Sequence, residues 1–215
     1  MASLVSPVLH AYTGKTDVYF DVAEDGGLSV TIDTERLHIR SVESTPHDHT
    51  SYAALFGDRD VMRTFADGTT RTKEQIKTSI DTRWAKRWKE NDPYSALAVF
   101  KNDTDEFAGH VVLGHGDNPG ESEIAYLFMK NCWKQGFGTE AVTSVVREYA
   151  PATVAKGYTL GGEPLTKIVA TARTDNTGSC KILEKVGMRQ TGIEEKFGSE
   201  RCFYAIELKD IQKKV

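Results

Sequence analysis

The sequence predicts a protein of mixed α and β structure (the α/β or α+β class), and three observations point to it. Residues 94–100 and 107–113 are predicted to be strands, and the turn Asn102-Asp103 between them indicates a β-hairpin. The segment Ile124–Met129 is apolar on both faces, as in a strand covered on both sides. Directly downstream, residues 142–149 carry apolar side chains at helical spacing. We therefore expect a sheet flanked by helices.

Residues 1–33 are predicted to be an N-terminal extension. Apolar and polar residues alternate over 18–22 and again over 28–32, and Asp25-Gly26-Gly27 offers a turn between them. An extra β-hairpin is expected here. The whole chain of 215 residues is long for one α/β domain and short for two, so residues 34–215 are expected to form one main domain.

The main domain opens with a strand and two helices. Leu37 and Ile39 indicate the strand, and a short helix is expected around residues 50–56. Thr72 and Gln75 form a capping-box pair at the start of the second helix. Pro93 ends this helix. Its apolar stripe has four-residue spacing and consists of Ile76, Ile80, Trp84 and Trp88.

The last third of the chain predicts a loop, a strand, a helix and a final hairpin. Pro151 and the Gly-rich segment Lys156–Pro164 indicate the loop, and Ile168–Ala172 indicates the strand. Asn176 is expected to cap the helix, which Gly187 ends in the left-handed conformation. The final strands are expected near residues 189–195 and 202–208, on either side of a turn at Gly198.

Composition excludes several classes of function. Hydrophobic residues make up 39% and charged residues 27% of the chain, as in an ordinary globular domain. No stretch approaches the roughly 20 apolar residues of a membrane span, and no signal-peptide start is seen, which predicts a cytoplasmic protein without membrane contact. A net charge of −4 argues against nucleic acid as a partner.

The sequence predicts no metal site. Its three cysteines are widely spaced, which suits a reducing compartment and neither a disulfide framework nor a zinc site. His47-Asp48-His49 lacks a third ligand at sensible spacing and is expected in a surface loop. His110 and His115 are weaker hypotheses for residues that line an acceptor cleft.

The turn Gln135-Gly136-Phe137-Gly138 has the pattern of an anion site. It follows the doubly buried strand and opens a helix, so amides beside the two glycines and in the first helical turn could bind a phosphate. Several such donors together suit a pyrophosphate better than a single carboxylate. The alternative is a connector that only lets a helix pack on a sheet. A dinucleotide G-x-G-x-x-G motif is excluded, because its third glycine would be Ala141.

Three segments carry recognisable motifs, and they follow one another along the chain: TERLHIR at 34–40, SEIAYL with WKQGFGTEA at 122–141, and DNTGSCKILEKVGM at 175–188. Together they resemble the opening strand, the acetyl-CoA motif and the late helix of the GNAT superfamily of N-acetyltransferases. The resemblance covers roughly residues 34–208 and is greatest to the RimJ/RimL-like branch, which acetylates the N-terminal residue of ribosomal proteins. It departs at Trp133, where the superfamily often has Arg or Gln, and at Gly138, where the branch often has Ala.

The resemblance implies a mixed, mostly antiparallel sheet that is splayed at the acyl-CoA site, and it makes residues 34–215 an acetyltransferase domain. Acetyl-CoA would be the co-substrate. Backbone groups of the splayed strand would meet its pantetheine arm and the developing oxyanion. The implied cofactor-binding residues are Leu127, Phe128, Met129, Lys134, Gln135, Gly136, Phe137, Gly138, Thr139 and Asn176.

Direct transfer to a neutral amine is the implied chemistry, and it needs a route for the proton and a donor for the thiolate. Glu123 is the predicted general base, directly or through a water, or else a solvated carboxylate at a strand end. Asn176 would contact the cofactor arm while capping its helix. Ser179 would stabilise the thiolate or serve only as a capping residue. The family's tyrosine acid seven residues after the Asn is replaced by Leu183, which leaves Ser179, water or Tyr204.

Three functions stay open, two of which differ in the amine that is acetylated. An N-terminal α-amine has a pKa near 7.7–8.0 and is easier to deprotonate than a lysine amine near 10.4, so a protein or peptide N-terminus is favoured. A small amine (antibiotic, polyamine or amino-acid derivative) is the alternative, and a closed aromatic pocket at the Trp84/Trp88 helix would favour it. A non-catalytic CoA-binding module is the third. The chain would act as a monomer or a homodimer.

Overall fold

One mixed sheet forms the centre of the fold, and the computed structural model describes it within residues 14–212. Its nine strands are β1 (Asp17–Val22), β2 (Leu28–Asp33), β3 (Leu37–Ser41), β4 (Ala96–Lys101), β5 (Phe107–His115), β6 (Glu121–Phe128), β9 (Lys167–Arg173), β10 (Arg189–Lys196) and β11 (Ser199–Glu207). Their order is β1-β2-β3-β4-β5-β6-β9-β11-β10. The neighbours β6 and β9 run parallel and the other pairs run antiparallel, as expected.

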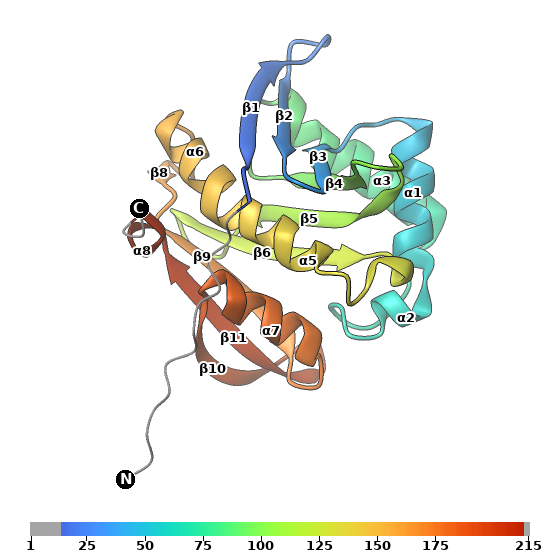
Figure 1. The fold of residues 1–215 in the computed structure, drawn as a ribbon, viewed down its shortest axis with the longest axis vertical. Helices are drawn as coiled ribbons and strands as arrows, with labels where there is room; N and C mark the ends of the chain where they lie inside the picture. Colours follow the sequence, from blue (N-terminus) through green and yellow to red (C-terminus); the bar gives the residue numbers. More distant parts are fainter. Residues whose placement is uncertain (1–13, 213–215) are drawn as a thin grey trace.

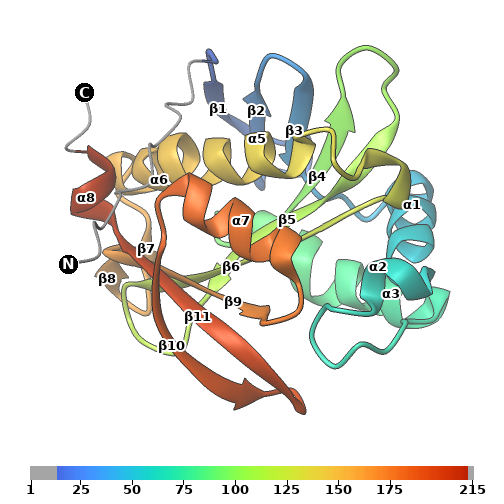
Figure 2. The same ribbon diagram turned by 60° about the horizontal axis from the view of Figure 1, so that its bottom comes forward.

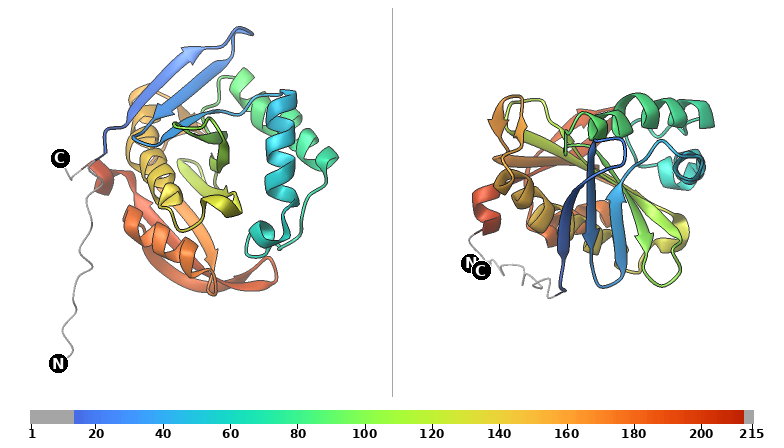
Figure 3. Two further views of the ribbon diagram at one scale, coloured as in Figure 1. Left: turned by 45° about the vertical axis from the view of Figure 1, so that its right-hand side comes forward. Right: turned by 90° about the horizontal axis from the view of Figure 1, so that it is seen from above.

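Helices cover both faces of this sheet (Figure 1; Figure 3, left). One layer contains α1 (Pro46–Gly57), α2 (Arg59–Met62), α3 (Lys73–Ser79), the π-helical turn η1 (Ile80–Trp84) and α4 (Ala85–Lys89). The other contains α5 (Phe137–Ser144), the π-helical turn η3 (Val145–Tyr149), α6 (Ala150–Ala155) and α7 (Thr177–Val186). Short elements complete the chain: the 3-10 turn η2 (Lys130–Cys132), the ribbon of β7 (Thr159–Leu160) and β8 (Glu163–Pro164), and α8 (Leu208–Gln212).

The N-terminal hairpin extends the main sheet. β1 pairs with β2 over Asp17–Val22, and β2 pairs in turn with β3. Val30 and Ile32 are fully buried because they lie on the covered face, so the hairpin contributes to the same core. The division into an extension and a domain remains a prediction, and its residues 1–13 lie outside the described part of the chain.

The layer of α1, α3 and α4 is anchored by caps and by a buried ion pair. The predicted capping box of α3 is present, with Thr72 and Gln75 bonding each other's backbone. Helix α1 begins earlier than expected because Thr45 caps it. The prediction of a surface loop at residues 47–49 is therefore wrong. Asp48 lies fully buried in the first turn of α1, where its carboxylate Oδ1 is 2.7 Å from the Arg40 guanidinium of β3.

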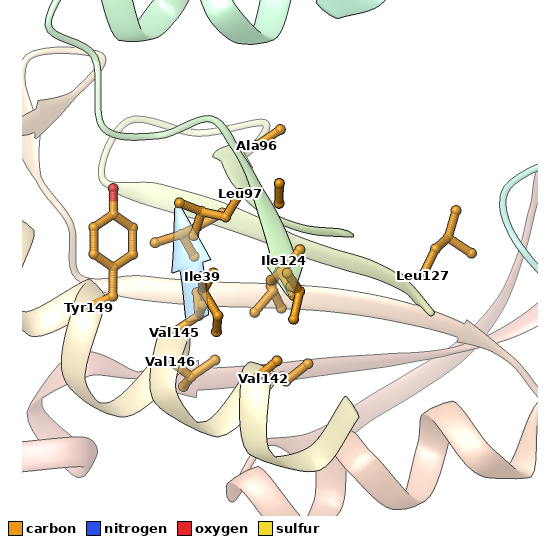
Figure 4. Close-up of a cluster of buried hydrophobic side chains, with 14 of the residues drawn as sticks. Ile39, Ala96, Leu97, Ile124, Leu127, Val142, Val145, Val146 and Tyr149 are labelled. Carbon is orange, nitrogen blue, oxygen red and sulfur yellow. The ribbon is translucent and has the colours of Figure 1, made fainter. Parts of the chain in front are cut away.

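The opposite face of the sheet packs on the helix that follows the Gly-rich turn. Figure 4 shows the apolar stripe of this helix facing Ile39, Leu97 and Ile124 of the sheet. The helix does not end at Pro151, as the sequence had suggested, but continues to Ala155. The π-helical turn η3 starts a new helical segment at Ala150, and a proline in the first turn of a helix leaves no backbone bond unmade.

Candidate active site

The sheet splits between β6 and β9. These strands pair only over Glu121–Glu123 and Lys167–Val169 within the described residues, and then diverge toward α2 (Figure 2). Beyond this point β6 continues to Phe128 with β5 as its partner, while β9 continues to Arg173 beside β11. A cleft of about 940 Å³ occupies the gap, and this is the predicted splay.

The Gly-rich turn opens one mouth of this cleft with an uncapped helix. Gly136 is the N-cap of α5 in the left-handed conformation, with φ +86°, and no side chain among residues 14–212 caps this end. By contrast, Thr45 caps α1 and Asn176 caps α7. The first-turn amides of α5 are therefore available to an anion, which the helix dipole also favours.

A glycine in the first turn of α5 and three nearby lysine side chains make this mouth suitable for a phosphate group. A Cβ on Gly138 would lie 3.0 Å from Ile182 Cδ1 and 3.4 Å from the Phe128 ring, so a larger side chain there would press on α7 and β6. Lys134, Lys181 and Lys185 line the same cleft and bring positive charge. This donor set fits the pyrophosphate of a CoA thioester.

A buried carboxylate fixes the Gly-rich turn to the start of the sheet. Glu140 of α5 is 7% exposed and accepts hydrogen bonds from Thr34 Oγ1 at 2.7 Å, from Arg36 N at 2.9 Å and from Arg36 Nε at 2.7 Å. Arg36 also donates to the Gln135 carbonyl and lies over the Phe137 ring. The sequence analysis missed this contact, although both partners lie in segments of the family resemblance.

The backbone of β6 presents alternate residues to the gap. Met129 N–H donates to the Ala108 carbonyl, and the Leu127 carbonyl faces Gly109, so both residues direct their polar groups at β5. With a period of two, the backbone groups of Ile124, Tyr126 and Phe128 point into the gap. The backbone of Leu127, Phe128 and Met129 was predicted to meet the cofactor. Of these three, only Phe128 directs its backbone groups into the gap, and its carbonyl accepts a hydrogen bond from Trp133 Nε1.

Ser179 and Tyr126 form a hydrogen-bonded pair at the cleft. Ser179 Oγ lies 2.9 Å from the Tyr126 hydroxyl, which also donates to the Ser179 carbonyl. Burial raises the pKa of Tyr126 and the hydrogen bond with Ser179 opposes this, so the phenol stays protonated in the neutral range. Tyr126 is a functional candidate that the sequence analysis missed. Its position in the motif strand, on the face that α7 covers, was the available signal.

Asn176 and Glu123 line the cleft from different directions. The Asn176 side chain accepts from Ser179 N–H and donates to Thr64 Oγ1 at 2.9 Å, across the mouth of the cleft. Glu123 is the last β6 residue paired to β9, and its carboxylate is 40% exposed and 3.9 Å from Lys196 Nζ. Tyr126 lies three positions after Glu123 on the same strand, an odd spacing, so the two side chains reach the gap from opposite faces of the sheet.

Most of the predicted site residues therefore come together. The cleft is lined by Glu123, Leu127, Phe128, Lys134, Gly136, Gly138, Thr139, Asn176 and Ser179. Three predicted cofactor residues do not line it: Met129, Gln135 and Phe137. Tyr204 does not line it either, because its buried hydroxyl points to Glu184 on α7, 3.5 Å away.

Trp84 and Trp88 form no aromatic pocket at the cleft, the feature that would have favoured a small-amine acceptor. Trp84 and Trp88 are buried core residues, and the Trp88 indole donates to the Ala96 carbonyl. His110 does not line the cleft. It is enclosed by aromatic rings, and burial, with the Arg83 charge as a smaller cause, lowers its pKa to about 3. His115 is held by Asp92 at 2.7 Å.

The described part of the chain contains neither a metal cluster nor a membrane-spanning helix. Within residues 14–212, no three histidine, cysteine or carboxylate side chains are grouped as a metal site would require. In the same range, no helix has both the length and the apolar character needed to cross a membrane.

Comparisons with known proteins identify the family. Residues 36–189 match the model described as acetyltransferase (GNAT) domain. The chain is 26% identical over 165 residues to the uncharacterized N-acetyltransferase YnaD of Bacillus subtilis (strain 168). The aligned part covers 77% of this chain and 86% of that protein.

Two solved structures are similar in fold. The spermidine N-acetyltransferase from Vibrio cholerae, in complex with CoA and spermine, gives a TM-score of 0.65 at 15% identity, over 82% of this chain and 98% of that one. The ribosomal-protein-S5-alanine acetyltransferase from Vibrio fischeri gives 0.64 at 16% identity, over 84% and 97%. At these identities the likeness shows the fold alone. Because the family model spans most of the sequence, the chain belongs to the GNAT family and is an N-acetyltransferase, a class of enzyme that uses acetyl-CoA.

Proposed function

We propose that this chain transfers the acetyl group of acetyl-CoA directly to the N-terminal α-amine of a protein or peptide, as RimJ/RimL-like enzymes do. The observation that carries the proposal is the gap between β6 and β9, which side chains reach from both faces of the sheet. An uncapped helix end with nearby lysines lies at one mouth, and a carboxylate enters from the other face. Such a passage can keep a thioester donor and an amine acceptor apart until their reacting atoms meet.

Four polar side chains of the cleft have roles in this proposal. The acceptor amine approaches from the face of Glu123, which receives the amine proton directly or through a water. The N–H groups of β6 that point into the gap donate to the oxyanion that develops on the thioester carbonyl. On the opposite face, Ser179 donates a hydrogen bond to the departing sulfur while Tyr126 hydrogen-bonds Ser179, and Asn176 contacts the cofactor arm while capping its helix.

An α-amine suits this site better than a lysine side chain. About a tenth or more of an α-amine is neutral at pH 7, whereas deprotonating a lysine amine at that pH costs about 4–5 kcal/mol. The proposed base is a single, partly exposed carboxylate, Glu123, which lies near Lys196. The similarity to the S5-alanine acetyltransferase agrees with an α-amine, and the similarity to the spermidine enzyme keeps a small amine as the second candidate. A cytoplasmic monomer or homodimer completes the proposal.

Thiol release from acetyl-CoA tests the proposal. The purified chain is assayed with N-terminal peptides, with spermidine and with a lysine peptide whose α-amine is blocked. We expect release with the free N-terminal peptides at the highest kcat/KM. Faster turnover of spermidine would contradict the choice of acceptor, and no release with any amine would contradict the proposed activity.

CoA binding tests the assignment of the Gly-rich turn. Gly138→Leu places a branched side chain against Ile182 and Phe128, so we expect it to abolish CoA binding in calorimetry. Gly138→Ala is the matched control, because one added carbon presses only on the movable end of Ile182 and makes an ordinary contact with the Phe128 ring. Tight CoA binding by Gly138→Leu would contradict the position proposed for the pyrophosphate.

A further inference from the structure

The acceptor face of the cleft carries an arginine that is buried without an anion. Arg201 of β11 is 4% exposed and lines the cleft. Its guanidinium donates to Thr171 Oγ1 at 3.1 Å and, at 3.4 Å each, to the carbonyls of Thr171 and Ala66. Among residues 14–212 it has no ion pair with a carboxylate. A charge buried in this way is costly unless an opposite charge approaches it.

Arg201 lies on the same face of the sheet as Glu123. It pairs with Arg173 across β11 and β9, and its side chain reaches Thr171, which is two residues away and on the same face of β9. Its bond to Ala66 places it under the segment that follows α2, the layer opposite α5 and α7. This is the face from which we propose that the amine enters.

The other charges of the cleft leave Arg201 unneutralised. The carboxylates that line the cleft are Asp60, Glu123 and Asp175, and each already has a cationic neighbour: Lys130, Lys196 and Arg173. Burial, and next the Arg173 charge, lower the pKa of Arg201, which Glu123 only partly offsets.

Arg83 adds to this positive field. It also lines the cleft, lies over the Trp84 ring and forms no ion pair within residues 14–212. A polyamine bound here would bring its own cations next to two arginines. An acceptor with an anionic group would instead gain charge-assisted hydrogen bonds.

We propose that Arg201, together with Arg83, binds a carboxylate of the acceptor, so that the substrate is a primary amine with a carboxylate close by. This inference rests on the proposed acetyl transfer to an amine and names the class of acceptor. The carboxylate has two possible sources: an acidic side chain near the N-terminus of a peptide, or the carboxyl group of an amino acid or short peptide. Arg201 acts here as a specificity residue, since it contacts the acceptor away from the reacting atoms.

Matched acceptor pairs test the inference by thiol release. The first pair is an amidated peptide with Glu at its second position and the same peptide with Gln. The second pair is an amino acid and its carboxamide, with kcat/KM corrected for the fraction of free amine. We expect the wild-type chain to prefer the carboxylate in one pair by roughly tenfold to a hundredfold, the range for a hydrogen bond to a charged group. The preferred pair identifies the source.

Variants show whether Arg201 causes the preference. We expect Arg201→Met to bring the carboxylate-to-carboxamide ratio close to one, Arg201→Lys to restore part of it, and Arg83→Met to lower it. Arg189→Met removes the same charge from exposed β10, outside the cleft, and should keep the ratio. Arg83 is exposed, so its variant stays informative if Arg201→Met does not fold.

Two outcomes would overturn the inference in different ways. Equal rates on both members of both pairs, or a preference that survives Arg201→Met, would overturn the role of Arg201 and leave acetyl transfer intact. No thiol release with any acceptor would instead overturn the proposed function, and the inference with it.

Discussion

At the scale of single residues, this site differs from one with a single general acid, because the Tyr126 and Ser179 hydroxyls form a hydrogen-bonded pair. The two hydroxyls are 2.9 Å apart, and they approach from β6 and α7 on the two sides of the gap. A buried phenol that stays protonated can donate to Ser179 while the Ser179 hydroxyl donates onward to a thiolate. In that arrangement neither hydroxyl acts independently of the other.

A double-mutant cycle tests this dependence. We expect Tyr126→Phe and Ser179→Ala each to lower kcat by roughly a hundredfold, at the lower end of general acid catalysis, with CoA affinity changed only a few-fold. The double variant should be little worse than either single variant, because removing one member already disables the pair. Effects that multiply in the double variant, measured by steady-state kinetics, would show that the two hydroxyls act separately.

His110 makes the fold sensitive to acid. Its pKa is lowered to about 3 by burial, whereas an unfolded chain titrates its histidines near 6.5. Between these values the unfolded state binds a proton that the folded state does not, so stability is complete above about pH 6.5 and is lost as the pH falls. The expected slope is about 1.4 kcal/mol per pH unit.

Replacing His110 by a residue that does not titrate should flatten this dependence. His110→Gln can keep a hydrogen bond to the Tyr52 hydroxyl, which lies 3.1 Å from His110 Nδ1. Urea unfolding at several pH values between 6.5 and 4 measures the slope, and exposed His47→Gln is the control. Parallel pH profiles for wild type and His110→Gln would contradict the assignment.

At the scale of elements, Glu140 links α5 to the residues that precede β3. It holds Thr34 and Arg36 at once, and Arg36 also holds the Gln135 carbonyl, so the Gly-rich turn is fixed from outside the cleft. A phosphate site made of backbone amides depends on such support, because the donors must be oriented before the ligand arrives.

Weakening this link should therefore affect cofactor binding at a distance. We expect Glu140→Gln to lower the free energy of unfolding by about 1–3 kcal/mol, the cost of a buried charged hydrogen bond left unmade. CoA affinity should fall roughly tenfold by calorimetry. Glu148→Gln, on an exposed position of η3, the turn that follows α5, should change neither quantity. Unchanged CoA affinity in a destabilised Glu140→Gln would show that the link serves only the fold.

Local signals made most of these elements predictable. The capping box at Thr72, the Asn176 cap and the left-handed Gly187 depend on residues a few positions apart, and all three are present. Contacts between distant segments were not predictable in this way. Arg36 and Glu140 are far apart in sequence, and Pro151 is accommodated because α6 begins at Ala150, after the π-helical turn η3.

The site shows the same limit. The resemblance brought Glu123, Asn176, Ser179 and the Gly-rich turn together, and the cleft contains them. It could not say which β6 backbone groups face the gap, because a shift of one residue in a strand reverses every direction. Burial of Arg201 without a carboxylate depends on the packing of β9, β11 and the segment after α2, which no local pattern encodes.

At the scale of the whole molecule, the sheet consists of two arms that part at the active site. β1 to β6 form one arm, and β9, β11 and β10 form the other, with pairing between them limited to the start of β6 (Figure 2). The larger arm is extended by the N-terminal hairpin, whose strands lie at the edge farthest from the gap. The hairpin should thus stabilise the fold without taking part in the cleft.

Ile32 separates these two roles. It is fully buried in β2, so Ile32→Ala should lower the free energy of unfolding by about 2–5 kcal/mol, as other large-to-small core changes do. CoA affinity, measured where the variant remains folded, should stay within about twofold of wild type. Thr31→Ala, next to it on the opposite face of β2, should change stability by less than about 1 kcal/mol. Urea unfolding measures the stabilities and calorimetry the affinity. If Ile32→Ala were as stable as wild type, the hairpin would fold separately from the main sheet, and a loss of CoA binding at full stability would instead place the hairpin within reach of the cofactor site.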